Sequence, residues 1–438
     1  MSKHTNRSHI AHLIADYTHT IRDPLWRDIP LSDGFKELFS CEPMQKLSRI
    51  KQLGPAHLVY PGAVHTRLDH SLGVFHATRL IMISLLTQAQ AGESDFHISF
   101  EGMQALLTAA LLHDMGHFPY AHALKDCVTK EHEHLGAQLI AQDDIIKSIV
   151  ENSIGTSIDA VCQIIDTTIP CDSSEINFLR TILSGTLDPD KLDYLSRDAL
   201  FCGIPYGMQD ASYIIRNLLV PHFSNQIAIP IEAIGAVEHL LFAKYSMYRN
   251  VYWHQATRSA TAMIKKAVHL GLQENQFPEH SLFGQDDESF AQLLTQVAHS
   301  PTEQLFSAVR SNSLLVPKAT LPYVETPQNI RLYWEQSERT HHEQEVWRAL
   351  RPHYPQLREY EIIIDIPEDV SFESDIAILT EQGEILPFNQ VDELFTSHVV
   401  ETFTSSLRKI RVYAPRYIDS QHLHSIATGI LTHESQSR

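Results

Sequence analysis

The sequence is poor in cysteine, and the few cysteines it has are not arranged in pairs. Five are scattered along 438 residues, and no two are spaced as Cys-x-x-Cys. An odd number without paired spacing argues against both a disulfide framework and a thiolate zinc site. We therefore expect reduced thiols and a cytoplasmic protein.

Long hydrophobic runs are also missing. The N-terminal stretch MSKHTNRSHIAHLIADY lacks the apolar core of a secretion signal. The longest apolar stretches, such as LIMISLL, are far too short to cross a bilayer. We expect no membrane association.

Basic residues are outnumbered: 34 Lys and Arg face 53 Asp and Glu, a formal net charge of -19. A chain that neutralises phosphates along a nucleic acid is normally basic, so this balance argues against a nucleic-acid partner. A small anionic ligand remains open, because a local pocket of Arg and Lys can oppose the overall field. The length allows one large domain with appendages, or two or three domains.

Apolar residues at three- and four-residue spacing predict helices through most of the first 270 residues. The clearest segments are FKELFSCEPMQKLSRIKQLG, LGVFHATRLIMISLLTQAQ and EGMQALLTAALLHDMGH. The stretch 231–270 contains no proline after its start and predicts one long helix, with Lys244, Tyr248 and Tyr252 on one face.

The pattern changes after about residue 320. YEIIIDIP, DIAILTEQGEILPF and RKIRVYAP are rich in β-branched residues, and the second predicts a hairpin around 381–383. SQHLHSIATGIL predicts a closing helix. The expected fold is mainly α: a helical catalytic domain over 1–320, with its metal core at 50–265, followed by a mixed α+β lobe over 321–438.

Histidine is abundant, with 27 residues, and one cluster stands out. The stretch LLHDMGHFPYAH places His113 beside Asp114 at the end of an apolar run, with His117 and His122 just beyond. Both members of an adjacent His-Asp pair are costly to bury without a partner. A divalent metal would satisfy them, because imidazole nitrogen and carboxylate oxygen both bind Mg, Mn, Fe or Zn.

Three further clusters could complete a site, and each also has an ordinary structural explanation. They are His65, Arg67, Asp69 and His70 in VHTRLDHSLGV; His132, Glu133 and His134 in KEHEHLG; and Asp188, Asp190, Lys191, Asp193, Tyr194, Arg197 and Asp198 in DPDKLDYLSRD. His70 alone would more often be a capping or interior histidine. The third run could be an exposed helix with ion pairs such as Asp193–Arg197.

The order of these clusters resembles a known pattern. His70, then His113-Asp114, then Asp190 is similar to the H…HD…D pattern of the HD phosphohydrolases. The segments RIKQLGPAHLVYPGAVHTR, HTRLDHSLGV, LLHDMGHFPYAH, EHEHLG, DPDKLDYLSRDALFCGIPYG and YRNVYWH resemble the deoxynucleoside triphosphate triphosphohydrolases related to the vertebrate SAM-and-HD-domain restriction factor. The resemblance covers residues from about 20 to about 265, and weakly the C-terminal lobe.

The resemblance implies a metal-dependent enzyme that cleaves a dNTP into a deoxynucleoside and inorganic triphosphate. The implied metal ligands are His70, His113, Asp114 and Asp190. The metal itself, Mn, Fe, Mg or Zn, stays open, as does a second Mg that enters with the nucleotide. Relatives of this kind form dimers to tetramers, so a homo-oligomer is expected.

The resemblance also assigns roles to other histidines. His117 and His132 would contact the α-phosphate, His122 would donate a proton to the departing 5′ oxygen, and Glu133 would orient a neighbouring histidine. Histidine suits proton transfer because its ordinary pKa lies near working pH. The chain departs from the family at Lys125, where the restriction factor carries an acidic residue.

Substrate-binding positions follow in the same way. The resemblance implies Arg67, Lys191 and Lys244 at the triphosphate, and Gln52, Leu53, Tyr194, Asp198, Tyr248 and Tyr252 around the sugar. Tyr252 would exclude a ribose 2′ hydroxyl, and Asp198 would accept from the 3′ hydroxyl. Tyr248 has an equally good explanation as a core aromatic. Ser40 and Ser48 replace guanine-reading residues, so activation by a guanine nucleotide is not expected, and either another nucleotide activator or none remains open.

Two other interpretations remain. The chain could be an HD hydrolase of another nucleotide, such as an NDP, an NMP or an alarmone. It could also be a non-catalytic nucleotide sensor or nucleic-acid scaffold on the same fold. The presence of all four ligands weighs against an inactive site.

Overall fold

A computed structural model describes residues 2–370 and 376–433, and it confirms the mainly helical fold. The helices are α1 (Ser2–Ala15), α2 (Asp33–Ser40), α3 (Glu42–Gln45), α4 (Arg67–Ala91), α5 (Phe100–Leu112), α6 (His132–Gln142), α7 (Asp144–Ser148), α8 (Ile158–Ile165), α9 (Ser174–Leu183), α10 (Pro189–Cys202), α11 (Ala211–Asn217), α12 (Ile234–Met247), α13 (Gln255–Gln273), α14 (Asp287–Thr295), α15 (Pro301–Arg310), α16 (Pro327–Trp334), α17 (Gln336–Leu350), α18 (Phe388–Val391), α19 (Ser397–Leu407) and α20 (Ser420–His433).

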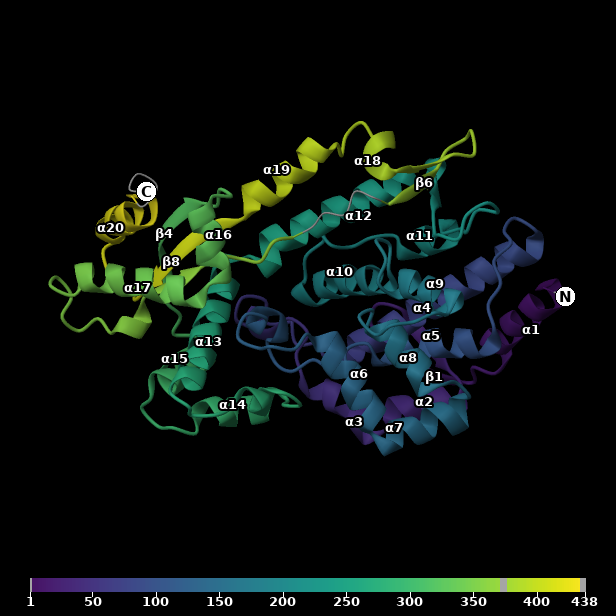
Figure 1. The fold of residues 1–438 in the computed structure, drawn as a ribbon, viewed down its shortest axis with the longest axis horizontal. Helices are drawn as coiled ribbons and strands as arrows, with labels where there is room; N and C mark the ends of the chain where they lie inside the picture. The colour runs from purple at the N-terminus through teal and green to yellow at the C-terminus, as the bar shows by residue number, and fades with distance from the viewer. Residues whose placement is uncertain (1, 371–375, 434–438) are drawn as a thin grey trace.

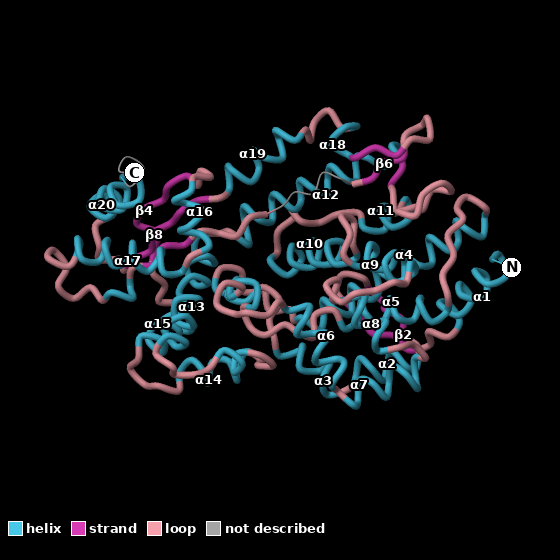
Figure 2. The backbone as a smooth tube through the Cα atoms, viewed as in Figure 1, coloured by secondary structure: helices cyan, strands magenta, loops and turns pink. Residues whose placement is uncertain are grey.

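The strands form three small sheets at separate places on the molecule (Figure 2). They are β1 (His19–Asp23), β2 (Arg27–Leu31), β3 (Ile229–Pro230), β4 (Val316–Pro322), β5 (Ile363–Asp365), β6 (Ala377–Leu379), β7 (Ile385–Pro387) and β8 (Lys409–Ala414). β1 pairs with β2, β3 with β6 and β6 with β7, and β8 lies between β4 and β5.

Helix α4 is the centre of the helical core. It packs against α1, α5 and α10, and its apolar side chains belong to the largest buried cluster. By length and composition α4 could cross a membrane, but 72% of its apolar window is buried inside the fold. The apolar character of α4 is thus explained by core packing.

The long helix expected over 231–270 is wrong in one respect. α12 ends in a π-helical turn over Tyr248–Tyr252, and a new helix, α13, starts at Gln255. The amide of Trp253 donates to the carbonyl of Tyr248, and His254 leaves helical geometry at ψ 134°. Trp253 is buried beside Val370, so tertiary packing breaks the helix where no glycine or proline does.

The C-terminal strands confirm much of the expectation. β5, β8 and α20 lie in the segments named, and β6 and β7 form the hairpin around 381–383, with Gly383 at φ +80°. Asp375, the first residue expected in that hairpin, lies outside the described residues. β1, β2, β3 and β4 were not expected. β2, β3 and β4 contain proline, and among the described strands β3 pairs with β6 alone, far along the chain.

The C-terminal part of the chain packs closely on the helical part. A cluster of buried side chains joins Phe118 and Leu124 to α13–α15, Ile363 and Tyr413. Residues 376–403 run back along α12 (Figure 1), where Ile378 and Phe388 pack on Val237. The boundary near residue 320 stays a prediction, because packing continues across it.

Candidate functional site

The four predicted metal ligands come from the ends of three core helices. His70 lies in the first turn of α4, which Thr66 and Asp69 cap reciprocally. His113 and Asp114 follow the last turn of α5. Asp190 is the second residue of α10. Because α4 packs on both other helices, these ends meet at one place.

The polar atoms of these four side chains lie close together. His70 Nε2 lies 2.8 Å from Asp190 Oδ1, and His113 Nε2 lies 3.3 Å from Asp114 Oδ1 and 3.9 Å from Asp190 Oδ1. Burial works to lower the pKa of His70, but its hydrogen bonds to Asp190 and Asp193 overcome that and raise it to about 10. A cation among these carboxylates would replace the proton.

His113 gives the clearest sign that a metal fits. Its Nδ1 donates to the carbonyl of Ala110 at 2.9 Å, which leaves the lone pair on Nε2. That Nε2 is buried and has no hydrogen-bond partner in the part of the chain that the structure describes. Ligand atoms of His70, His113 and Asp114 lie within 4.8 Å of one another. These residues could hold a divalent metal, whose identity the donor types leave open.

Asp193 supports this site from behind, whereas the sequence suggested only an ion pair with Arg197 for it. Its Oδ2 accepts from His70 Nδ1 at 2.8 Å, which directs Nε2 of His70 into the site. Arg197 binds both oxygens of Asp193, at 2.8 and 2.9 Å, and Trp26 Nε1 donates at 2.6 Å. The Asp193–Arg197 pair therefore exists, but the exposed setting proposed for it is wrong, since both side chains are fully buried.

Arg67 fixes the orientation of Asp114. Its Nη1 donates to Oδ2 of Asp114 at 2.8 Å, so only Oδ1 faces the metal ligands. Burial works to raise the pKa of Asp114, but the nearby imidazole of His117, the guanidinium of Arg67 and the imidazole of His113 hold it well below the ordinary value. Asp114 is thus held as a carboxylate, and Arg67, predicted at the triphosphate, is already engaged with a ligand residue.

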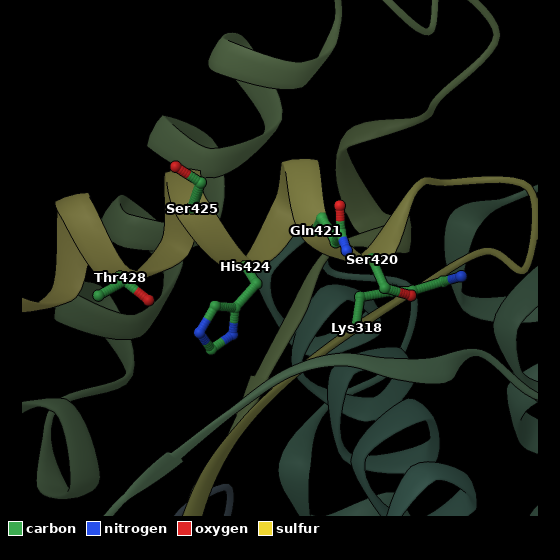
Figure 3. A pocket seen from close by; sticks show the side chains of 6 residues that line it. All are labelled: Lys318, Ser420, Gln421, His424, Ser425 and Thr428. Carbon is green, nitrogen blue, oxygen red and sulfur yellow. The ribbon is translucent and has the colours of Figure 1, made fainter.

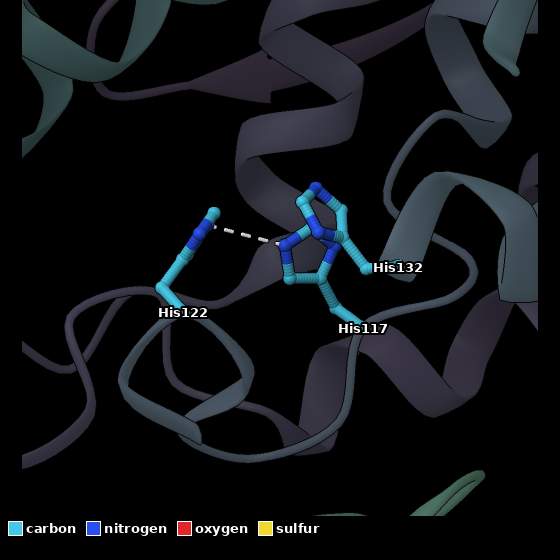
Figure 4. Close-up of side chains that lie close together, drawn as sticks. All are labelled: His117, His122 and His132. Atoms are coloured by element: carbon cyan, nitrogen blue, oxygen red, sulfur yellow. Dashed lines mark hydrogen bonds between the residues drawn. The ribbon is translucent and has the colours of Figure 1, made fainter. Parts of the chain in front are cut away.

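The other predicted histidines form a second cluster beside the metal ligands. His117 Nδ1 lies 3.1 Å from Asp114 Oδ1, and its Nε2 lies 3.2 Å from Nε2 of His122. The ring of His132 lies 4.0 Å from that of His117 between centroids. Figure 4 shows the three rings turned toward one another. His117 and His122, which precede residues 125–131, thereby lie beside His132, which follows them.

Two acidic residues close to this cluster in sequence, Glu133 and Asp126, have different partners. Glu133 Oε1 lies 3.1 Å from His132 Nε2, and although burial works to raise the pKa of Glu133, its hydrogen bond with His132 lowers it to about 2. Asp126, next to Lys125, instead pairs with Lys265 at 2.6 Å and with Arg339. Asp126 therefore ties its loop to α13 and α17.

The candidate metal ligands and the histidine cluster open into one cavity of about 1130 Å³. The predicted residues that line it are Gln52, Leu53, Arg67, His70, His113, Asp114, His117, His122, His132, Glu133, Asp190, Tyr194, Asp198, Tyr248 and Tyr252. Lys191 and Lys244 do not line it. Lys191 Nζ contacts Asp188 Oδ2 at 2.6 Å, and Lys244 is buried on α12. Their contacts with a phosphate stay predictions.

An aromatic and acidic wall closes one side of the cavity. Tyr252 donates to Asp198 Oδ2 at 2.7 Å, and His65 Nε2 lies 2.8 Å from the other oxygen. The ring of Tyr252 packs edge-on against those of Tyr194 and Tyr248. A sugar hydroxyl would therefore share Asp198 with Tyr252.

The C-terminal part of the chain supplies wall residues that the sequence did not indicate. Tyr333 and Trp334 at the end of α16 line the cavity, as do Glu368 and Asp369. Arg258 and Lys265 of α13 line it too, with their charges on Asp365 and Asp126. No local motif marks Trp334, because only the folded chain brings it to the helical core.

A second hollow, of about 580 Å³, lies apart from these residues. Lys318 and one face of α20 line it with polar side chains, among them Gln421 and His424 (Figure 3). Lys318 Nζ donates to the carbonyl of Arg416 at 3.0 Å. The predicted site residues all lie elsewhere.

Comparison with known proteins agrees with the geometry. Residues 67–167 match the model of the HD domain, and residues 210–437 match the model of the HD associated region. The first match includes three of the four predicted ligands, and the second spans α12, α13 and the C-terminal wall.

The chain is also similar to curated proteins. The chain is 34% identical to protein MJ1154 of Methanocaldococcus jannaschii, over 63% of this chain and 54% of that protein. It is 25% identical to the deoxynucleoside triphosphate triphosphohydrolase SAMHD1 homolog of Dictyostelium discoideum, over 62% of this chain and 52% of that protein. The chain thus spans about half the length of these curated relatives.

A solved structure shares the fold. The phosphohydrolase BT4208 from Bacteroides thetaiotaomicron superposes with a TM-score of 0.70 at 21% identity, over 91% of this chain and 100% of that one. Because the model of the HD associated region matches residues 210–437, more than half of the sequence, the chain belongs to the HD-domain family that carries this region.

Proposed function

We propose that this protein is a metal-dependent hydrolase that cleaves a dNTP between the α-phosphorus and the 5′ oxygen, and releases a deoxynucleoside and inorganic triphosphate. One observation carries the proposal: the His70, His113, Asp114 and Asp190 ligand set, the three-histidine cluster and the Tyr252–Asp198 wall open into a single cavity. A cavity of this size can enclose a nucleotide.

The ligand set would hold one divalent cation, which supplies positive charge to a phosphate oxygen. The chain's own residues would position the rest. His117 lies beside Asp114 and the ring of His132 lies beside that of His117, so both can donate to oxygens of the α-phosphate. Phosphoryl transfer needs little covalent help, so positioning and charge stabilisation supply most of the rate.

His122 is proposed to protonate the departing 5′ oxygen. Enclosure in the cavity, with His117, His132, Arg67 and Lys125 nearby, holds the pKa of His122 well below its ordinary value. A bound triphosphate reverses this balance, because several negative charges beside the ring favour the imidazolium. His122 would then become an acid when substrate is present.

Selectivity for a deoxyribose is proposed to rest on Tyr252. Its hydroxyl is fixed on Asp198, and its ring is held between Tyr194 and Tyr248. A rigid ring packed at the sugar would clash with a 2′ hydroxyl. Trp334 lines the same cavity and is 69% exposed. Its flat indole ring offers a surface on which the base can stack.

The test is direct detection of triphosphate. The full chain, loaded in turn with Mn²⁺, Mg²⁺, Fe²⁺ and Zn²⁺, is incubated with each dNTP singly and with all four mixed. We expect triphosphate as one unit from at least one dNTP, and its loss in His113→Ala. His134→Ala, an exposed histidine two residues beyond His132, is the matched control.

The other outcomes each identify a different function. Orthophosphate or pyrophosphate alone would contradict the proposed bond. Faster turnover of an NTP, NDP, NMP or alarmone would assign another nucleotide to this cavity. Binding without turnover, unchanged in His113→Ala, would indicate a nucleotide sensor. Activity only on the mixture would reveal an activating nucleotide.

A further inference from the structure

The three-histidine cluster has the geometry of a ligand set in its own right. One ring nitrogen from each of His117, His122 and His132 lies within 4.8 Å of the others. Nε2 of His117 and Nε2 of His122 face each other at 3.2 Å, as the dashed line in Figure 4 marks. Two lone pairs at this distance repel unless a proton or a cation lies between them.

Asp114 determines which nitrogen of His117 is free. A carboxylate oxygen 3.1 Å from Nδ1 favours the tautomer with the proton on Nδ1, because a lone pair there would face negative charge. The lone pair of His117 is then on Nε2, directed at His122. Carboxylate support of this kind is common behind histidines that bind metals.

The charges around the cluster favour some metals over others. Glu133 brings a carboxylate oxygen 3.1 Å from His132 Nε2. Arg67 and Lys125 are also near, but Arg67 is paired with Asp114, and Lys125 Nζ lies 3.3 Å from Glu131. Three imidazoles suit Zn²⁺ or Co²⁺, whereas Mg²⁺ prefers oxygen.

We propose that His117, His122 and His132 form a second metal site, distinct from the His70, His113 and Asp114 set, which binds a nitrogen-preferring transition metal such as Zn²⁺. Three protein ligands leave one position of a tetrahedral ion open. The consequence for activity rests on the proposed function: a metal on His122 removes the proton donor, so excess Zn²⁺ inhibits the enzyme.

Cobalt titration of the nucleotide-free full chain tests the site, because four-coordinate Co²⁺ absorbs visible light far more strongly than six-coordinate Co²⁺. We expect about two bound equivalents in the wild type and about one in His122→Asn and in His132→Asn, with loss of the strong absorption. His70→Asn should keep that absorption. His134→Asn is the control and should match the wild type.

His122 lies on the exposed wall of the cavity, so its replacement spares the core, and far-UV circular dichroism checks the fold of each variant. Equal binding and absorption in wild type and His122→Asn would overturn the proposal. So would a single equivalent in the wild type that His70→Asn abolishes.

Inhibition is tested on the Mn²⁺-activated enzyme. Added Zn²⁺ should reduce turnover over the same concentration range in which the second site fills. A filled site with unchanged turnover would refute the inhibitory role. Because binding is measured without nucleotide, failure of the site and failure of the proposed hydrolysis are separate results.

Discussion

At the scale of single residues, the site depends on side chains that touch no substrate. Asp193 holds His70 by one oxygen and is itself held by Arg197 and Trp26. Arg197 also donates to Asp23 at 2.8 Å. Burial works to raise the pKa of Asp193, but Arg197 and His70 keep it below the ordinary value. This buried network positions the metal ligand.

Asp193→Asn should lower the affinity for the activating metal by about 10- to 100-fold, since the imidazole of His70 loses its carboxylate support. Metal affinity by calorimetry measures this. Asp198→Asn is the matched control: it lies on the same helix, is equally buried, and contacts His65 and Tyr252 instead. Asp198→Asn should weaken nucleotide binding and spare metal affinity. Equal metal affinity in both variants would refute this role of Asp193.

Acid stability depends on another buried histidine, His76. Burial, followed by the charge of Arg79, lowers the pKa of His76 to about 4. The unfolded chain, with a histidine pKa of 6.5, therefore binds more protons than the folded chain between pH 6.5 and pH 4. The part of the unfolding free energy that depends on a neutral His76 is fully present above pH 6.5 and is lost as the pH falls toward 4.

His76→Leu should flatten the fall in unfolding free energy over this range, by up to about 3 kcal/mol. Urea unfolding at several pH values between 7 and about 4 measures it. His97→Leu, at an exposed position, is the control and should leave the slope as in the wild type. A slope unaffected by His76→Leu would show that other groups cause the acid loss.

At the scale of elements, the candidate metal site requires α4 and α10 to approach closely. A Cβ built on Gly73 of α4 would lie 1.9 Å from Asp193 Oδ1 and 2.5 Å from Arg197 Nη2. Both atoms belong to the buried pair that supports His70, so neither can move freely. Glycine at this position is what lets the two helices bring His70 and Asp190 together.

Gly73→Ala should therefore destabilise the protein by about 3 kcal/mol, through overpacking, and weaken metal binding as well. Thermal unfolding with and without metal measures both effects. Gly235→Ala in the first turn of α12 has 3.8 Å to its nearest neighbour and should be neutral or stabilising by up to about 1 kcal/mol. Unchanged metal affinity in Gly73→Ala would show that metal binding does not depend on the close packing of α4 and α10 at Gly73.

Local periodicity predicted α4, α5 and α20, and motif order brought His70, His113, Asp114 and Asp190 to one site. It missed the break at Trp253 and the strand β3, because their causes are Val370 and β6, distant in sequence. Asp193 was seen only as a helix surface charge, since its burial depends on Asp23 and Trp26.

At the scale of the whole molecule, buried charges tie the C-terminal part of the chain to the cavity. Arg258 of α13 pairs with Asp365 of β5, and Arg339 of α17 pairs with Asp126 in the loop after His122. Lys266 of α13 pairs with Glu343 of α17 at 2.5 Å. The same α13 lines the cavity through Arg258 and Lys265. Loss of these ion pairs should therefore disturb the cavity.

Glu343→Gln tests that connection. Glu343 also accepts from the amide of Ile364 at 2.9 Å, so the carboxylate joins α13, α17 and β5. The change leaves Lys266 as a buried, uncompensated charge and should cost about 3 kcal/mol of unfolding free energy. Chemical denaturation measures this, and nucleotide affinity should fall with it because α13 loses its anchor.

Asp28→Asn is the matched control, since it breaks a pair of similar geometry at the surface. Asp28 and Arg22 are joined at 2.8 Å, but each side chain is 65% exposed. Water and salt screen such a pair, so its loss should cost less than about 1 kcal/mol and leave nucleotide affinity unchanged. Equal, small costs for both variants would show that the C-terminal part is held by apolar packing around Ile363 and Tyr413 rather than by its buried charges.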